Sequence, residues 1–164
     1  MRVYHLQEVL PNTNEAVELL VVSITSPLLV GVYKKGLLIE SFGSKEKTSK
    51  ALPKILSEVD QRYRLSGFYY AKGPGSFMAI KVTYVMLKTL SIALKIPLLA
   101  CDAFAFNGNK PIKAIGKSCF IKEDGKIIIQ KNCSDIDMTF KLPSSLDKSC
   151  FDSDNKPLYI LPAV

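Results

Sequence analysis

Three apolar runs, separated by short turn signals, lie between residues 19 and 42. The run at residues 19–25 is continuous and rich in β-branched residues, which is typical of a strand buried on both faces. The runs at residues 28–34 and 37–42 predict two further strands. Lys35-Gly36 provides a tight turn between the second and third runs. Because no helical segment separates these runs, they predict an antiparallel meander.

The apolar period changes to that of a helix from Thr48 or Ser49, either of which could cap a helix. Pro53 then falls in the first turn, where proline is tolerated. The apolar stripe of this segment consists of Leu52, Ile55, Leu56, Val59 and Tyr63. The pattern predicts a helix over residues 49–64 that packs on the sheet through one face.

A second helix is predicted over residues 76–95, and it carries apolar side chains in most directions. Lys81, Lys88 and Lys95, spaced seven residues apart, form its consistent charged stripe, and these charges argue against a membrane span. A helix of roughly 30 Å is too long to be enclosed completely by so small a chain. We therefore expect a partner to cover part of its surface.

Short apolar runs at residues 67–73 and 96–101 complete the order β-β-β-α-β-α-β. Helical connections require parallel strands, and right-handed crossovers place both helices on one face of the sheet. The sequence therefore predicts an α/β lobe at residues 19–107 with a mixed sheet of about five strands. Residues 1–18 show no sustained period and are expected to be an N-terminal extension of uncertain structure.

Residues 108–164 are expected to form a reduced, β-rich second lobe or a tail, because they are too few for a second full domain. Apolar runs at 114–122 and 126–131 flank Glu123-Asp124-Gly125, which predicts a hairpin. Residues 132–156 are polar and weakly patterned. The segment 156–162 could supply one more strand.

The formal net charge is +7, and the excess is almost entirely lysine. It predicts either a solvated lysine surface or weak attraction to polyanions. The four cysteines include no Cys-x-x-Cys pair and His5 is the single histidine, so no zinc site is expected. Residues 1–18 lack the pattern of a secretory signal. We expect a soluble, cytoplasmic protein with four ordinary thiols and no membrane association.

The turn Gly73-Pro74-Gly75-Ser76 introduces the second helix and has two interpretations. A helix N-terminus approached by glycines can bind an anion, or such a turn can pack a helix closely on a strand. Both interpretations stay open for Gly73, Gly75 and Ser76. Asp102, which follows the last strand of the lobe, could belong to a site at the sheet edge or could cap a short helix.

The segments GPGSF at 73–77 and KIPLLACDAFA at 95–105, together with the order of elements, resemble the TsaB family, also called YeaZ. The resemblance covers residues 19–106 well and implies an actin-like ATPase, or ribonuclease H-like, lobe. It also implies a non-catalytic subunit that dimerises with a TsaD-like enzyme, which transfers threonylcarbamoyl to adenosine of tRNA (the t6A modification). A TsaE-like ATPase would dock on that heterodimer, and tRNA would be an indirect partner. The chain alone would bind no cofactor, while ATP or ADP could lie in the complex.

The chain departs from the family pattern at several positions, and each change points away from catalysis. Ile24 stands where the family has an aspartate after the first strand, and an isoleucine can neither ligate a metal nor position a phosphate. The other changed positions are Lys47, Met78, Ala79, Lys81 and Thr83. Side chains larger than glycine at 79 and 83 fill space that a closely approaching nucleotide would need.

The expected partner interface lies on the two helices, although part of it must cover the sheet. It consists of Leu52, Ile55, Val59, Val82, Met86, Thr89, Leu90 and Ala93. Two alternatives to a scaffold subunit remain. One is a small actin-like ATPase or kinase that uses the glycine turn on phosphate, and the other is a homodimeric binding protein that uses the same helices.

Overall fold

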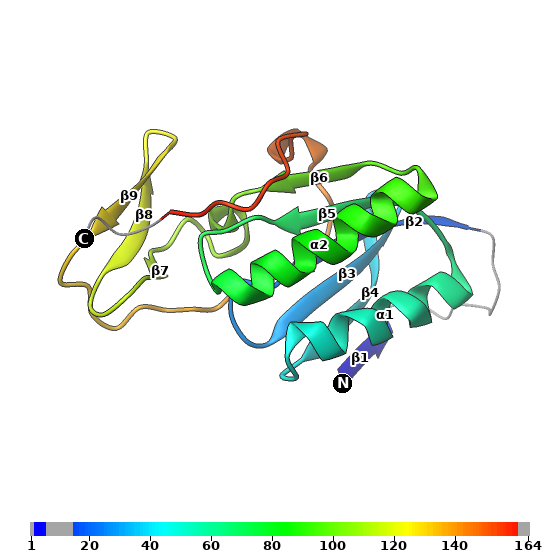
Figure 1. Ribbon diagram of the computed structural model, residues 1–164, viewed down its shortest axis with the longest axis horizontal. Helices are drawn as coiled ribbons and strands as arrows, with labels where there is room; N and C mark the ends of the chain where they lie inside the picture. The colour runs from blue at the N-terminus through cyan, green and yellow to red at the C-terminus, as the bar shows by residue number, and fades with distance from the viewer. Residues whose placement is uncertain (1, 6–14, 161–164) are drawn as a thin grey trace.

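The computed structural model describes residues 2–5 and 15–160, and its main element is a six-stranded sheet (Figure 1). The strand order is β1-β4-β3-β2-β5-β6. The strands are β1 Arg2–His5, β2 Ala16–Val22, β3 Leu28–Lys34, β4 Leu37–Ser44, β5 Arg64–Ala71 and β6 Leu98–Cys101. Strands β1 to β4 pair antiparallel, whereas β2–β5 and β5–β6 are parallel. The predicted mixed sheet is therefore confirmed.

The edge strand β1 was not predicted. It pairs with β4, with Arg2 opposite Gly43 and His5 opposite Glu40, so the sheet has six strands instead of about five. Four residues are too few to show a period in the sequence, and the pairing partner lies far along the chain. Strand β2 begins at Ala16, earlier than the expected start at residue 19. Residues 6–14 of the expected extension lie outside the described residues.

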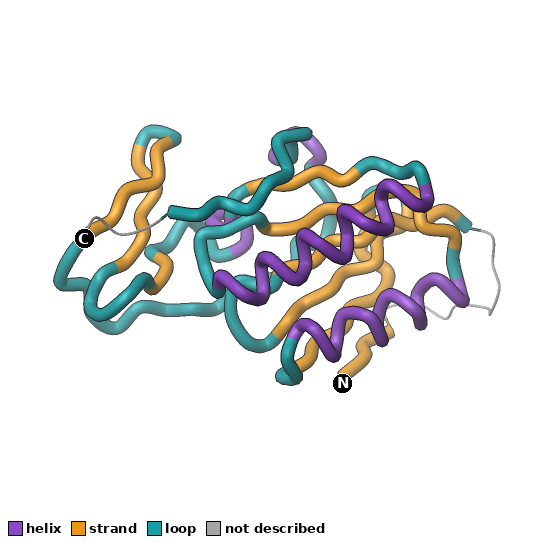
Figure 2. The backbone as a smooth tube through the Cα atoms, viewed as in Figure 1, coloured by secondary structure: helices purple, strands orange, loops and turns teal. Residues whose placement is uncertain are grey.

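Helices α1 (Thr48–Arg62) and α2 (Phe77–Leu94) lie on the same face of the sheet, as the crossovers require (Figures 1 and 2). Lys95 is the C-cap of α2 and adopts the left-handed conformation with φ of 56°. Neither helix has a side-chain cap, so the capping role expected of Thr48 or Ser49 is not observed. Lys47 and Ser76 occupy the N-cap positions, and neither side chain makes a capping hydrogen bond.

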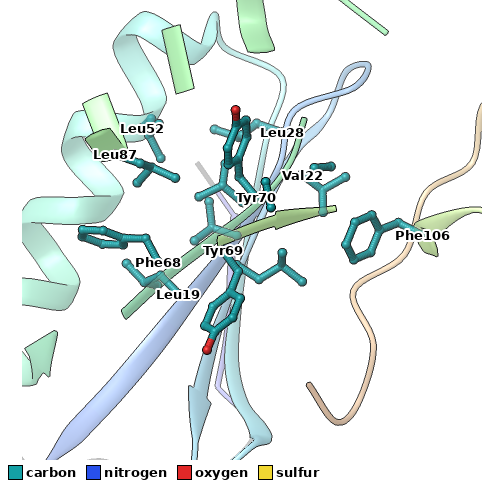
Figure 3. Close-up of a cluster of buried hydrophobic side chains, with 14 of the residues drawn as sticks. Leu19, Val22, Leu28, Leu52, Phe68, Tyr69, Tyr70, Leu87 and Phe106 are labelled. Atoms are coloured by element: carbon teal, nitrogen blue, oxygen red, sulfur yellow. The ribbon is translucent and has the colours of Figure 1, made fainter. Parts of the chain in front are cut away.

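The core lies between the sheet and the two helices (Figure 3). Leu52 and Leu87 project from the helices onto Leu19 and Phe68 of the central strands, and all four side chains are completely buried. Burial of each such side chain contributes about 1.5 to 3 kcal/mol. The alternation of β5 sends Tyr69 to the opposite face of the sheet from Tyr70. Both faces of the central strands are therefore buried, which explains their continuous apolar sequence.

A second, three-stranded sheet follows the short 3₁₀ helix η1 (Ala103–Phe106). Its strands are β7 Ile112–Lys113, β8 Cys119–Glu123 and β9 Lys126–Gln130, and the predicted hairpin is confirmed. A disulfide joins Cys119 to Cys133, so the prediction of four ordinary thiols is wrong. The two cysteines are distant in sequence, and only the hairpin brings them together.

Residues 140–160 form a strap that returns to the first sheet. Leu146 N donates to Gly36 O at 2.8 Å, and Tyr33 Oη donates to Pro143 O at 2.7 Å. After η2 (Lys148–Cys150), Asp152 forms an isolated bridge with Ala100 at the β6 edge. Residues 156–160 form no strand, contrary to the prediction, and residues 161–162 of that segment lie outside the described residues.

Candidate partner interface and the glycine turn

Helix α2 is attached to the sheet by a narrow face. Its buried residues are Ile80, Thr83 and Leu87, whereas Met78 is 63% exposed and Ile92 is 68% exposed. Phe77, Val85 and Leu94 are also large exposed apolar residues. Because monomeric proteins rarely expose so many large apolar side chains on one element, this surface has the character of an interaction site.

The exposed apolar residues of α2 follow a seven-residue repeat. Met78, Val85 and Ile92 are seven residues apart, and Val82 and Thr89 fall between them, which gives the alternating three- and four-residue spacing of a helix-packing seam. Lys81, Lys88 and Lys95 follow the same period. We call Met78, Val82, Val85, Thr89 and Ile92 the α2 seam. Its geometry suits a second helix laid along α2 at a shallow angle.

A groove of about 560 Å³ runs between the two helices beside the α2 seam. On the α1 side it is lined by Pro53, Leu56, Ser57 and Asp60, and on the α2 side by Val85, Met86, Thr89, Leu90 and Leu94, with Leu65 also contributing. The groove is mainly apolar and continuous with the seam through Val85 and Thr89. A side chain from a partner helix could enter it.

The structure divides the expected interface residues into two groups. Leu52, Ile55 and Val59 are completely buried in the core, so their assignment to a partner surface is corrected. Val82, Met86 and Leu90 are half-buried, and Thr89 and Ala93 are exposed. Met78, Val85 and Ile92 were not among the expected interface residues, although their spacing matches that of the lysine stripe and could have revealed them.

Helix α2 is also long and apolar enough, by length and composition, to cross a membrane. One helix of this kind is weak evidence for a span, since helices that pack within or between proteins satisfy the same criteria. Here Ile80, Thr83 and Leu87 are packed within the protein. The absence of membrane association stays a prediction.

The glycine turn before α2 is packed against the loop after β2. A Cβ atom added at Gly75 would lie 2.6 Å from Ile24 Cγ2 and 2.9 Å from Ile24 O. Ser76 N donates to Ile24 O at 2.8 Å. Gly73, with φ of 116°, lies against the backbone of Leu158, and its carbonyl accepts from Ala103 N at 2.8 Å. These contacts favour the packing interpretation of Gly73, Gly75 and Ser76 over phosphate binding.

The cleft between this turn and the second sheet does not fit a nucleotide. It has a volume of about 470 Å³ and is lined largely by apolar side chains, including Ile24, Phe77, Ile115, Phe120 and Met138. Tyr159 of the strap packs on Phe77 with ring centroids 4.9 Å apart. Among the described residues that line it, Lys113 is the only charged one, and none of them supplies a carboxylate to hold a magnesium ion.

Asp102 has a structural role at the join between the two sheets. Its Oδ1 accepts from Phe104 N at 3.0 Å, which caps η1, and its Oδ2 pairs with Lys122 Nζ of β8 at 2.5 Å. The capping alternative is therefore confirmed. The neighbouring Cys101 is buried, and burial raises the pKa of its thiol to about 12, so it is not a ready nucleophile. The described residues contain no group of three or more His, Cys, Asp and Glu able to hold a metal.

Comparisons with known proteins agree with this fold. The family model described as TsaD, tRNA N6-adenosine threonylcarbamoyltransferase, matches residues 43–110, which contain α1, β5, α2 and β6. The "tRNA threonylcarbamoyladenosine biosynthesis protein TsaB" of Buchnera aphidicola subsp. Acyrthosiphon pisum (strain APS) is 29% identical over 103 residues, which cover 57% of this chain and 47% of the relative. The chain thus spans about half the length of this curated relative.

Solved structures show the same fold. YeaZ from Pseudomonas aeruginosa superposes with a TM-score of 0.51 at 16% identity, over 70% of this chain and 64% of that protein. A second structure, described as an uncharacterized protein with similarity to peptidase YEAZ from Pseudomonas aeruginosa, gives 0.50 at 17% identity, over 70% and 63%. The likeness covers the actin-like lobe architecture that the sequence predicts.

Proposed function

We propose that this chain, which is similar to proteins of the TsaB (YeaZ) family, is a non-catalytic scaffold subunit of t6A tRNA modification. The partner is a TsaD-like enzyme, which transfers threonylcarbamoyl to adenosine of tRNA. The observation that carries the proposal is the α2 seam, in which Met78, Val85 and Ile92 are exposed apolar side chains spaced seven residues apart. A row of this kind is complementary to another helix and has no catalytic use.

The packing of the glycine turn supports the non-catalytic part of the proposal. Ile24 occupies the space in front of Gly75, and the described residues of the adjoining cleft form apolar walls without a metal-binding carboxylate. We propose that this chain binds no nucleotide by itself and that any ATP or ADP in the assembly is held by another subunit. Docking of a TsaE-like ATPase and location in the cytoplasm are further parts of the proposal.

The docking energy would come mainly from apolar burial. Burying Met78, Val85 and Ile92 contributes about 1.5 to 3 kcal/mol each, whereas an exposed ion pair from the lysine stripe contributes about 0 to 1 kcal/mol. Since each 1.4 kcal/mol is about a tenfold change in affinity, loss of the seam should abolish a micromolar complex. The flanking lysines would mainly set the orientation of the partner helix.

The test is co-purification with the TsaD-like protein of the same organism. The variant Met78→Glu, Val85→Glu, Ile92→Glu should lose the partner while its circular dichroism and melting temperature stay those of a folded monomer. Leu37→Glu together with Ile115→Glu is the matched control, because Leu37 is 61% and Ile115 75% exposed and neither residue belongs to the α2 seam. Retention of the partner by the seam variant would overturn the proposal.

Self-association through the same seam is a separate outcome that light scattering detects. If the wild-type chain alone is a dimer that the seam variant converts to a monomer, and the TsaD-like protein never binds, the chain is a homodimeric binding protein. If the partner binds and displaces the self-association, the scaffold function stands. Calorimetry with ATP and magnesium on the isolated chain tests the absence of nucleotide binding.

A further inference from the structure

The second sheet carries an unusual concentration of positive charge. Residues 110–131 contain six lysines, at 110, 113, 117, 122, 126 and 131, against the two carboxylates Glu123 and Asp124. Lys122 is paired with Asp102, and Lys110 is paired with Asp137. Lys126 lies opposite Glu123 at the hairpin tip. Most of the charge that remains therefore resides on Lys113, Lys117 and Lys131.

The register of the second sheet brings these three lysines to one end. Lys113 of β7 pairs with Cys119 of β8, which pairs with Gln130 of β9, the residue before Lys131. Cys133 N donates to Lys117 O at 2.7 Å, so the turn that contains Lys117 lies beside the chain just after β9. The Cys119–Cys133 disulfide ties this end together. Three lysines from three separate segments thus share one rigid edge.

Each of the three lysines is exposed and available to a ligand. Among the described residues, none of them forms an ion pair with a carboxylate. Seven other cationic side chains among the described residues do form ion pairs with carboxylates, including the partly buried Lys72 and Arg62. A group of unpaired lysines on a rigid edge attracts a ligand that carries regularly spaced negative charges.

We propose that Lys113, Lys117 and Lys131 form a contact surface for the phosphate backbone of RNA. The proposal rests on the proposed function, since the substrate of that assembly is a tRNA. It adds a direct contact where the sequence suggested only an indirect one. Lysine is suited to phosphate as a point charge, and no arginine or aromatic side chain lies in residues 110–131 except Phe120, which is buried. The contact therefore positions the RNA without reading its sequence.

The location of this surface leaves the α2 seam free. In Figure 1, β7, β8 and β9 lie at one end of the molecule, beyond the N-terminal end of α2, while α1 and the C-terminal end of α2 lie at the other. A partner helix on the α2 seam and an RNA backbone on the second sheet can therefore be bound at the same time. A scaffold with both contacts would hold the substrate beside the enzyme that modifies it.

The experiment measures binding of a fluorescently labelled, unmodified tRNA transcript to the isolated full chain between 50 and 200 mM salt. The variant Lys113→Glu, Lys117→Glu, Lys131→Glu should weaken binding roughly tenfold or more at the lowest salt, and should reduce the slope of log affinity against log salt by about 2 to 3. Lys35→Glu, Lys50→Glu, Lys156→Glu makes the same charge change at exposed lysines elsewhere and should weaken binding less than about threefold.

Equal losses in the two variants, or no binding of the transcript by the wild-type chain, would overturn the proposal. Ile115 lies between Lys113 and Lys117 in the sequence and is 75% exposed. An exposed apolar residue among lysines also suits an anionic membrane surface, so binding to vesicles of phosphatidylserine and phosphatidylcholine is measured in parallel. Binding to vesicles in preference to the transcript also overturns it. Failure of the TsaD-like protein to co-purify affects only the proposed function, because the transcript assay contains no partner.

Discussion

Ile24 and Gly75 are packed so closely that any side chain on Gly75 would enter the space of Ile24. A Cβ atom at position 75 would lie 2.6 Å from Ile24 Cγ2 and 2.9 Å from Ile24 O. Ser76 N donates to the same carbonyl at 2.8 Å. The glycine turn and the loop after β2 therefore form one rigid joint, which fixes the start of α2 and hence the direction of the α2 seam.

The variant Gly75→Ala should destabilise the fold by about 1 to 3 kcal/mol, because the added methyl group forces apart two backbone segments. Urea unfolding followed by circular dichroism measures the change. Gly43→Ala is the control, since a Cβ at Gly43 meets only Leu29 Cδ2 at 3.9 Å. The double variant Ile24→Ala, Gly75→Ala should cost less than the sum of its single changes. Additive costs would show that the two residues are not in contact.

The hydroxyls of Ser23 and Thr83 form a second link between the loop after β2 and α2. Their oxygens are 2.8 Å apart and both residues are buried. Thr83→Val keeps the shape but removes the hydrogen bond, so it should lower the free energy of unfolding by about 1 to 3 kcal/mol. Thr89→Val, at an exposed position of the same helix, should change it by less than about 0.5 kcal/mol. Equal effects at the two positions would contradict a role for the Ser23 contact.

The central fold could be predicted because its residues carry strong local periods. The apolar residues of β2, β3 and β4 and the 3.6-residue stripe of α1 are set by burial on the sheet. Strand β1 and the strap carry no such period, because they are held by backbone hydrogen bonds to distant residues, such as Leu146 N to Gly36 O. Contacts of that kind leave no pattern in a short segment of sequence.

The exposed apolar face of α2 was predicted only in part, for a physical reason. A helix that is apolar on most sides shows that two surfaces must be covered, but the sequence does not say which residues face the sheet. Leu52 and Ile55 carry the same signal as Met78 and Ile92, yet the first pair is buried and the second is exposed. Only the position of each helix on the sheet separates the two groups.

The thiols of this chain should react in a defined order. Cys150 is exposed, Cys101 is buried, and Cys119 and Cys133 are joined by a disulfide. A thiol reagent should therefore modify one cysteine per native chain, two after unfolding without reductant, and four after reduction. Burial also raises the pKa of Cys101 to about 12, so its reaction should stay slow up to mildly alkaline pH.

Mass spectrometry after alkylation gives this count directly. The variant Cys150→Ser should leave no fast-reacting thiol, which separates Cys150 from Cys101. Protein isolated from a reducing cytoplasm should be compared with protein oxidised in air, because disulfides are rare in that compartment. Detection of four free thiols, fast and slow together, on the native, air-oxidised chain would show that the Cys119–Cys133 bond is not formed.

Asp137 should contribute to the acid sensitivity of the second sheet. Its pKa is lowered to about 2, first by the hydrogen bond from Thr139 and then by the one from Lys110. Thr139 N and Lys110 Nζ both lie 3.0 Å from the carboxylate. Because the folded pKa is below the unfolded value of about 4, the carboxylate stabilises the fold above that value. This stabilisation is lost as the pH falls through the folded pKa, between about pH 4 and pH 2.

Carbon-13 NMR of the aspartate carboxyls follows this titration directly. The resonance of Asp137 should move at a lower pH than an aspartate without such partners, and Lys110→Gln should shift its midpoint upward. Asp137→Asn should remove its share of the stability difference between pH 5 and pH 2.5, and Asp124→Asn, which makes the same charge change at the exposed hairpin tip, is the control. A midpoint for Asp137 near pH 4 would mean that Thr139 and Lys110 do not hold the carboxylate in solution.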